Sequence, residues 1–165
     1  AGGAAVPRLM FKRVAVGGTF DRLHCGHELL LAATALVASE KVYVGITADL
    51  LLASKQWREL LQPYAQRAAM VEAYLRAVNP RIEIESGPLS DPKAPTQAEL
   101  DPFMEAIVVS EETLPGAHKI NEGRVARGYP PLTVVVVPVI GNIDPAHKLS
   151  STQLRAQDAA ASGAK

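Results

Sequence analysis

Two histidines, His24 and His27, stand three residues apart in a segment that opens with the paired glycines Gly17 and Gly18. Glycine lets a backbone approach a phosphate closely, where a Cβ would obstruct it. The start of a following helix adds unpaired N–H groups and the positive end of a dipole. Two imidazoles this close in sequence can point into one crevice and donate hydrogen bonds to phosphoryl oxygens. The segment therefore predicts a site that binds phosphates.

Simpler interpretations of the same residues exist. Paired glycines alone are typical of a tight strand-to-helix turn, and an isolated histidine is more often a capping or core residue. A zinc site built from His24, Cys25 and His27 is disfavoured, because adjacent side chains rarely converge on one ion and no fourth ligand cluster follows in the sequence. The eleven residues 17–27, taken together, favour phosphate chemistry.

A second candidate string lies near the end of the sequence, where Lys148 is followed by the hydroxyl residues Ser150, Ser151 and Thr152. Hydroxyls before a helical pattern are ordinary N-caps, which contribute about 1 kcal/mol of stability. The same donors, with the lysine charge, also suit the departing pyrophosphate of a nucleotide. Capping and phosphate binding are compatible, because both use the same groups.

The elements that must position these strings follow from hydrophobic patterning. Short β-branched runs alternate with amphipathic stretches, which predicts βαβ units around a mainly parallel sheet. We expect strands over residues 11–16, 41–47, 81–85, 106–110 and 132–137, and helices over 26–39, 64–78, 118–127 and 151–161. The predicted fold is α/β, a Rossmann-like open five-stranded mainly parallel sheet with helices on both faces.

Two segments resist this assignment. Residues 48–62 fit either helix or loop, and the proline-rich residues 87–102 are most simply a long irregular connection. In an open parallel sheet, the ligand crevice lies beyond the carboxyl ends of the strands. The first predicted strand ends where the segment 17–27 begins, so the fold prediction places the two histidines at that crevice.

Composition limits the partners. Lys plus Arg and Asp plus Glu are both 17, so no global positive field attracts nucleic acid. One cysteine, Cys25, excludes an intrachain disulfide and fits a reducing compartment, so we expect a cytoplasmic protein. The longest apolar run, 132–140, is far shorter than the roughly 20 residues that a membrane span needs. We expect a disordered leader over residues 1–10, one domain over 11–165, and neither nucleic acid nor a membrane as partner.

The glycine and histidine string resembles the signature of the nucleotidylyltransferase superfamily, in the order Gly18-Thr19-Phe20-Asp21, then His24, Gly26 and His27. The resemblance implies that His27 stabilises charge on the α-phosphate during an in-line displacement and that Thr19 contacts the acceptor phosphate. The run Ser150 to Thr152 resembles the Ile-Ser-Ser-Ser/Thr element that this superfamily places opposite the histidines. The domain over 11–165 is thus expected to be a nucleotidyltransferase domain.

Further strings resemble the eukaryotic-type phosphopantetheine adenylyltransferases: Ser54-Lys55, Leu60 to Tyr64 with Arg67, Val108 to Thr113, Gly116-Ala117, and Ile120-Asn121 with Arg124. This resemblance implies transfer of the adenylyl group of ATP to 4′-phosphopantetheine, giving dephospho-coenzyme A and pyrophosphate, with Mg²⁺ carried by ATP. The implied catalytic residues are His27, His24 and Lys55. The implied ATP ligands are Gly17, Gly18, His24, His27, Arg124, Lys148, Ser150, Ser151 and Thr152. The implied phosphopantetheine ligands are Thr19, Phe20, Asp21 and Lys55.

The chain departs from the bacterial form of this enzyme, which has Arg-Gly after its fourth strand, where Val109 to Thr113 stands here. The cation that contacts ATP must then come from elsewhere, and the sequence offers Arg124 or Lys119. We expect residues 87–102 to line a channel for the pantetheine arm. Judged from the residues alone, a lysine such as Lys55 on a polar connection is more often a solvated surface residue. Arg124 could equally be a solvent-facing partner of Glu122 or Glu111.

Two other functions remain open. A cytidylyltransferase acting on phosphocholine, phosphoethanolamine or glycerol phosphate shares the histidine string, but its second element typically begins with Arg-Thr and a glycine, which residues 148–152 lack. A nucleotide-binding regulator without catalysis is the alternative from another class. Coenzyme A would compete for the same site if it inhibits the enzyme, and the oligomeric state cannot be derived from the sequence.

Overall fold

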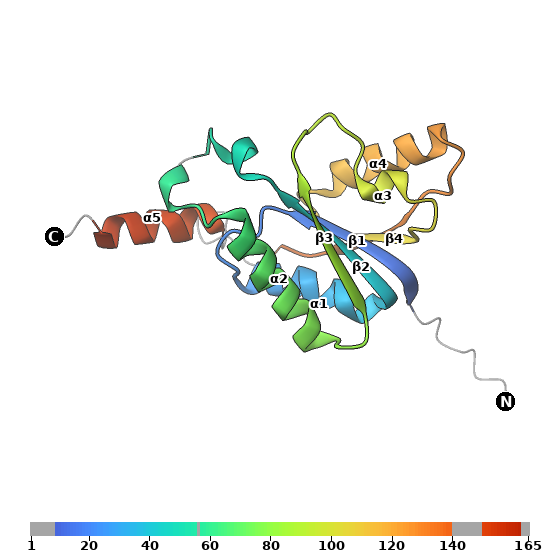
Figure 1. Ribbon diagram of the computed structural model, residues 1–165, viewed down its shortest axis with the longest axis horizontal. Coiled ribbons are helices and arrows are strands. Elements are labelled where there is room, and N and C mark those ends of the chain that lie inside the picture. The colour runs from blue at the N-terminus through green and yellow to red at the C-terminus, as the bar shows by residue number, and fades with distance from the viewer. Residues whose placement is uncertain (1–8, 56, 140–149, 163–165) are drawn as a thin grey trace.

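A five-stranded sheet organises the computed structural model, which describes residues 9–55, 57–139 and 150–162 (Figure 1). Its strands are β1 (Phe11–Gly18), β2 (Ala38–Thr47), β3 (Glu83–Leu89), β4 (Ala106–Ser110) and β5 (Thr133–Val137). The strand order is β3-β2-β1-β4-β5, and all four pairings are parallel. This confirms the predicted Rossmann-like sheet, and the order reverses between β1 and β4, where such sheets bind ligands.

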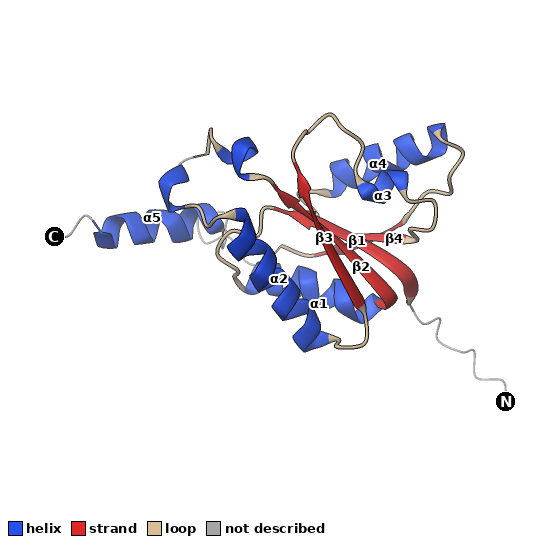
Figure 2. Cartoon of the chain, in the orientation of Figure 1, coloured by secondary structure: helices blue, strands red, loops and turns tan. Residues whose placement is uncertain are grey.

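Helices cover both faces of the sheet (Figure 2). The helices α1 (Cys25–Val37) and α2 (Tyr64–Val78) lie on one face, and α3 (Gln97–Leu100) and α4 (Leu114–Ala126) lie on the other. Each face buries its own apolar cluster, because successive side chains of a buried strand point to opposite faces. Val14, Val16 and Leu31 belong to the first cluster, and Ala15 and Ile107 to the second. The last helix, α5 (Ser151–Ser162), projects beyond the carboxyl ends of the strands (Figure 1).

Several boundaries differ from the sequence prediction. The helix expected over 26–39 ends at Val37, and β2 follows it without a loop, because Ala38 already pairs with Phe11 of β1. The strand expected over 81–85 is β3, which starts at Glu83 and continues to Leu89. It runs through Pro88 because β3 lies at the edge of the sheet, where a residue without an N–H costs no ladder hydrogen bond.

The two ambiguous segments also contain regular structure. Residues 48–62 hold two short 3₁₀ turns, Asp49–Leu52 and Arg58–Leu60, and the segment expected to be irregular contains α3. The helix expected over 118–127 begins four residues earlier, at Leu114, and Pro115 is tolerated there because a first helical turn needs no N–H partner.

The leader predicted over residues 1–10 falls mainly on residues 1–8, which lie outside the described residues. Among the helices that the structure describes, none is both long and apolar enough to cross a membrane.

Candidate active site

A cleft of about 370 Å³ opens at the carboxyl ends of β1, β4 and β5. The predicted site residues that line this cleft are Gly17, Gly18, Thr19, Phe20, His24, His27, Lys55, Ser150, Ser151 and Thr152. Segments more than 120 residues apart in sequence therefore share one cavity. Lys148 lies outside the described residues.

The two histidine rings stack with their centroids 3.9 Å apart at the start of α1. His24 is the N-cap of α1, because its Nδ1 accepts a hydrogen bond from the Gly26 N–H at 3.1 Å. The Nδ1 of His27 accepts in turn from the His24 N–H at 3.4 Å. A neutral imidazole that accepts at Nδ1 carries its proton on Nε2. Both rings therefore keep an Nε2–H donor, in a pair that borders the cleft.

Burial keeps these rings neutral near pH 7. The pKa of His27 is lowered to about 4, first by desolvation and then by the neighbouring His24, against smaller opposite effects of Asp21 and of the Arg22 backbone. Burial also lowers the pKa of His24, against a smaller opposite effect of Glu28. The pair thus offers two neutral hydrogen-bond donors, a kind of group that can bind phosphate oxygens without adding a fixed positive charge.

The glycine loop is shaped by two left-handed residues, Phe20 and Arg22, with φ of 54° and 49°. The Phe20 ring is 1% exposed and lies 5.6 Å from the His27 ring. A Cβ added at Gly18 would sit 3.2 Å from that ring. Phe20 thus forms a wall that packs against His27, and glycine at position 18 makes room for it.

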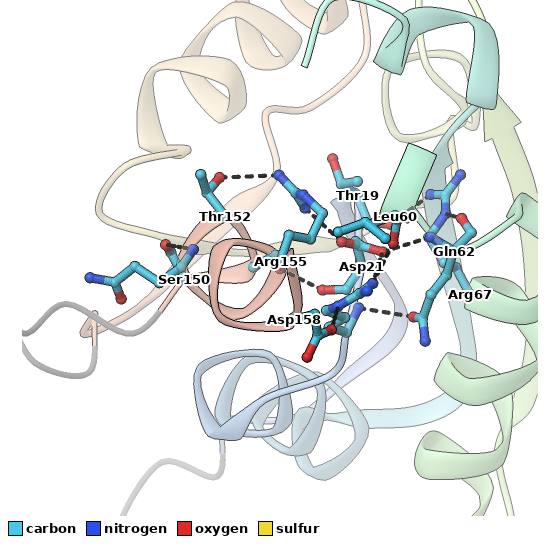
Figure 3. Close-up of polar contacts among 12 residues, drawn as sticks. Thr19, Asp21, Leu60, Gln62, Arg67, Ser150, Thr152, Arg155 and Asp158 are labelled. Atoms are coloured by element: carbon cyan, nitrogen blue, oxygen red, sulfur yellow. Dashed lines mark hydrogen bonds and ion pairs between the residues drawn. The ribbon is translucent and has the colours of Figure 1, made fainter. Parts of the chain in front are cut away.

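Asp21, expected at the acceptor substrate, is fully buried and turned away from the cleft surface. Its Oδ1 accepts from the Gln62 N–H at 2.9 Å, and its Oδ2 pairs with Nη1 of Arg155 at 2.6 Å. Figure 3 shows the Arg155 side chain reaching from α5 between Asp21 and Thr152. These contacts satisfy the carboxylate within the protein, and Asp21 is absent from the lining of the cleft.

The hydroxyls of α5 are held at the mouth of the cleft. The Ser150 hydroxyl accepts from the Gln153 N–H at 3.3 Å, as an N-cap does. The Ser151 hydroxyl donates to the carbonyl oxygen of Asp21, and that of Thr152 accepts from Arg155 at 3.1 Å. The first turn of α5 therefore faces the glycine loop with its N–H groups directed toward the cleft end of the helix.

The predicted cation Arg124 lies outside the lining of the cleft. Its side chain is 0% exposed on α4, and it does not line the cleft. Its guanidinium donates to four backbone carbonyls instead, those of Ala98, Asp101, Met104 and Pro130.

Lys119, the other cation considered, is exposed on the same helix and is also absent from the lining of the cleft. Lys55, between the two 3₁₀ turns, does border the cleft.

Sequence reasoning gave no role to three arginines around the glycine loop. Arg67 is fully buried and donates to the carbonyl of Thr19 at 2.7 Å and to that of Gln62 at 2.8 Å. Arg22 donates to Leu60 and pairs with Asp158, and Arg155 pairs with Asp21. Arg67 falls at the apolar spacing of α2, with Val71 and Leu75, and this was the available signal that it is buried. The pattern of α5 gives no such signal for Arg155.

No group of three or more His, Cys, Asp or Glu side chains that could hold a metal ion occurs in the part of the chain that the structure describes. The cleft instead offers imidazole N–H groups, hydroxyls and one lysine. This donor set suits the phosphate oxygens of a nucleotide.

The cytidylyltransferase-like family matches the chain over residues 15–157. The phosphopantetheine adenylyltransferase of Saccharomyces cerevisiae is 39% identical over 148 residues, which are 88% of this chain and 48% of the yeast protein. That of Methanopyrus kandleri is 39% identical over 151 residues, 92% of this chain and 93% of the archaeal protein. The chain spans about half the length of the yeast relative and nearly the whole of the archaeal one.

Solved structures share the same architecture. A protein of unknown function from Archaeoglobus fulgidus superposes with a TM-score of 0.63 at 31% identity, covering 76% of this chain and 88% of that one. The tyrosyl-tRNA synthetase of the same organism has a TM-score of 0.58 at 14% identity, covering 87% of this chain and 60% of that one. The second likeness concerns the fold alone.

Proposed function

The chain belongs to the cytidylyltransferase-like family and groups there with phosphopantetheine adenylyltransferases, so we propose that it transfers the adenylyl group of ATP to 4′-phosphopantetheine. The products are dephospho-coenzyme A and pyrophosphate, in the biosynthesis of coenzyme A. The single observation that carries the proposal is the cleft in which the histidine pair, Lys55 and the hydroxyls of α5 meet.

The reaction needs one bond to form and one to break at the α-phosphorus. A phosphate oxygen of the acceptor attacks that phosphorus, and the bond to the β-phosphate bridging oxygen breaks in line with the attack. Negative charge then grows on the non-bridging α-oxygens and on the leaving pyrophosphate. The Nε2–H groups of His24 and His27 donate to the α-phosphate, where the first charge develops.

The two ends of the reaction are held by different segments. Thr19 and Lys55 border the cleft on the acceptor side, and we assign them to the phosphate of 4′-phosphopantetheine. Ser150 precedes α5, and Ser151 and Thr152 begin it. We assign their donors to the departing pyrophosphate. Mg²⁺ would arrive bound to the triphosphate of ATP and would neutralise part of the charge there. Catalysis in this scheme rests on positioning and on preorganised donors.

The remaining parts of the substrates fit neighbouring surfaces. The cleft extends to the carboxyl end of β5, where Val137, Pro138 and Val139 offer apolar walls for the base of the nucleotide. A separate cavity of about 350 Å³ is lined by Tyr43 and by parts of residues 85–97. We assign it to the pantetheine arm, in line with the role expected of the proline-rich segment.

Pyrophosphate release tests the proposal. Wild-type protein with Mg²⁺ is given ATP with 4′-phosphopantetheine, or CTP with phosphocholine, phosphoethanolamine or glycerol phosphate. We expect release with ATP and 4′-phosphopantetheine only, and a loss of about 10²- to 10³-fold in His27→Ala, as for the removal of one donor to a developing charge. His118→Ala is the matched control, because His118 is exposed on α4.

Each other outcome assigns a different function. Release with CTP would make the protein a cytidylyltransferase, and binding of ATP without release for any pair would make it a nucleotide-binding regulator. Coenzyme A, which contains the product of this reaction, is expected to compete with ATP and 4′-phosphopantetheine. We place the reaction in the cytoplasm, in keeping with the single exposed cysteine, Cys25.

A further inference from the structure

A buried ion pair joins the glycine loop to the last helix. Arg155 of α5 is 2% exposed and Asp21 is 0% exposed, and their side chains meet at 2.6 Å. A second nitrogen of Arg155, Nη2, donates to the Thr152 hydroxyl at 3.1 Å. The guanidinium thus links the carboxylate behind the glycine loop to a hydroxyl at the mouth of the cleft (Figure 3).

The attachment of α5 depends on polar contacts of this kind. Neither apolar core cluster of the described residues contains a side chain of α5. The backbone carbonyl of Asp21 accepts from the Ser151 hydroxyl, so one residue holds the helix at two points. A further link, between Arg22 and Asp158 at 2.8 Å, lies farther along the helix and is partly exposed to solvent.

We propose that the Asp21–Arg155 ion pair is a positioning element for the triphosphate end of ATP. The Asp21 carboxylate is occupied by partners within the protein and acts on the substrate only through Arg155 and α5. The pair instead fixes the first turn of α5, with the hydroxyls of Ser151 and Thr152, in the place where the phosphates bind. The inference rests on the proposed function in that the ligand is ATP.

The physical reason is preorganisation. Donors held in place before the ligand arrives need not be ordered at its expense, so the ligand binds more tightly. A charge pair held away from water is strong and directional because the local dielectric constant is low. Without it, the first turn of α5 would keep its donors but lose their fixed place, and each nucleotide would have to order them.

One group needs a separate explanation. The Nε of Arg155 is buried and has no hydrogen-bond partner among the described residues, and Arg155 borders the cleft. A direct contact between this N–H and a phosphate oxygen is therefore the rival interpretation. The two interpretations predict different effects of removing the Asp21 charge, because only the positioning role requires the pair.

A double-mutant cycle separates them. Asp21→Asn keeps one oxygen for the Gln62 N–H and removes the charge, whereas Arg155→Met keeps most of the side-chain volume and removes all donors. ATP binding is measured by calorimetry without acceptor, well below the unfolding transition of each variant. We expect each single substitution to raise the Kd for ATP on the order of tenfold, and the double variant to be no weaker than either, as residues acting as one unit behave.

Two further variants complete the design. Arg155→Lys retains the charge opposite Asp21 but not the contact with Thr152, so its Kd for ATP is expected to lie between those of wild type and Arg155→Met. This variant replaces any variant of the cycle that does not fold. Asp158→Asn breaks the exposed pair on the same helix and is expected to leave the Kd within about twofold, since exposed pairs contribute little.

Two results would overturn the proposal. If Asp21→Asn leaves the Kd unchanged or tightens it while Arg155→Met weakens it, then Arg155 is a direct phosphate ligand. If both folded variants keep the wild-type Kd, the pair only stabilises the fold. Because the cycle measures binding without an acceptor, failure of turnover with 4′-phosphopantetheine would refute the proposed function and leave the result of the cycle intact.

Discussion

Replacing Arg124 with methionine would distinguish a nucleotide ligand from a structural residue. The resemblance places Arg124 at ATP, whereas its guanidinium is buried and donates to backbone carbonyls of three segments. Those segments are α3, the turn that leads into β4, and the connection between α4 and β5. We therefore expect Arg124→Met to weaken folding and to leave ATP binding unchanged.

The size of the effect follows from the contacts. Four hydrogen bonds of 2.7–3.1 Å are lost, and a net contribution of about 1 kcal/mol each gives a sum of about 4 kcal/mol. Methionine fills part of the space and removes the cost of burying a charge, which reduces the sum. We expect a loss of about 3 kcal/mol, a large share of the roughly 5–15 kcal/mol that keeps a typical domain folded.

Urea unfolding and ATP calorimetry measure the two quantities separately. Arg127→Met, at the C-cap of α4, is the matched control, because the Arg127 side chain is 41% exposed and pairs with Glu99 at 3.2 Å. We expect it to cost less than about 1 kcal/mol. A tenfold or larger rise in the ATP Kd of Arg124→Met, with an unchanged free energy of unfolding, would refute the structural role of Arg124.

Three further predictions concern the cleft. The pKa of His27 is about 4 in the folded protein and about 6.5 in the unfolded chain. The neutral His27 ring therefore makes its full contribution to the free energy of unfolding above pH 6.5, and this contribution is lost as the pH falls toward 4. After discounting for solvent exposure this amounts to about 1–2 kcal/mol, and urea unfolding of His27→Gln should show a shallower pH dependence; equal slopes would contradict it. Gly26→Ala places a Cβ 2.9 Å from Cε1 of His24, and the resulting ring shift should lower kcat about tenfold through lost alignment; an unchanged kcat would show that the His24 position is not critical. Lys55→Ala should reduce kcat/KM for the acceptor about 10²-fold without changing Tm, since Lys55 is exposed; normal kinetics would remove Lys55 from the site.

The sequence predicted the sheet and the cleft because both depend on local signals. Apolar β-branched runs such as β4 fall where the structure has strands, and β4 has the predicted bounds. The boundary between α1 and β2 was missed because Ala38 and Ser39 fit either element, and pairing with β1 decides in favour of the strand. Tertiary pairing of this kind has no local signature.

Buried arginines were the main gap in the site prediction. A charged residue within a helical pattern is usually solvated, and a resemblance transfers a role without showing where a side chain lies. Arg124 and Arg155 are both buried, yet one holds backbone carbonyls behind α4 and the other a carboxylate behind the glycine loop. Their partners are distant in sequence, so only the folded chain distinguishes their roles.

The outer edge of β3 has a consequence for the behaviour of the protein in concentrated solution. An uncovered edge strand presents unpaired backbone groups that can recruit a strand of another molecule. Pro88 interrupts the row of donors, and Glu83 and Glu85 are 70% and 52% exposed on the same strand. Both carboxylates pair with Lys41 of β2, so the missing N–H of Pro88 is what a second copy would meet at this edge, and it protects β3 against edge-to-edge aggregation.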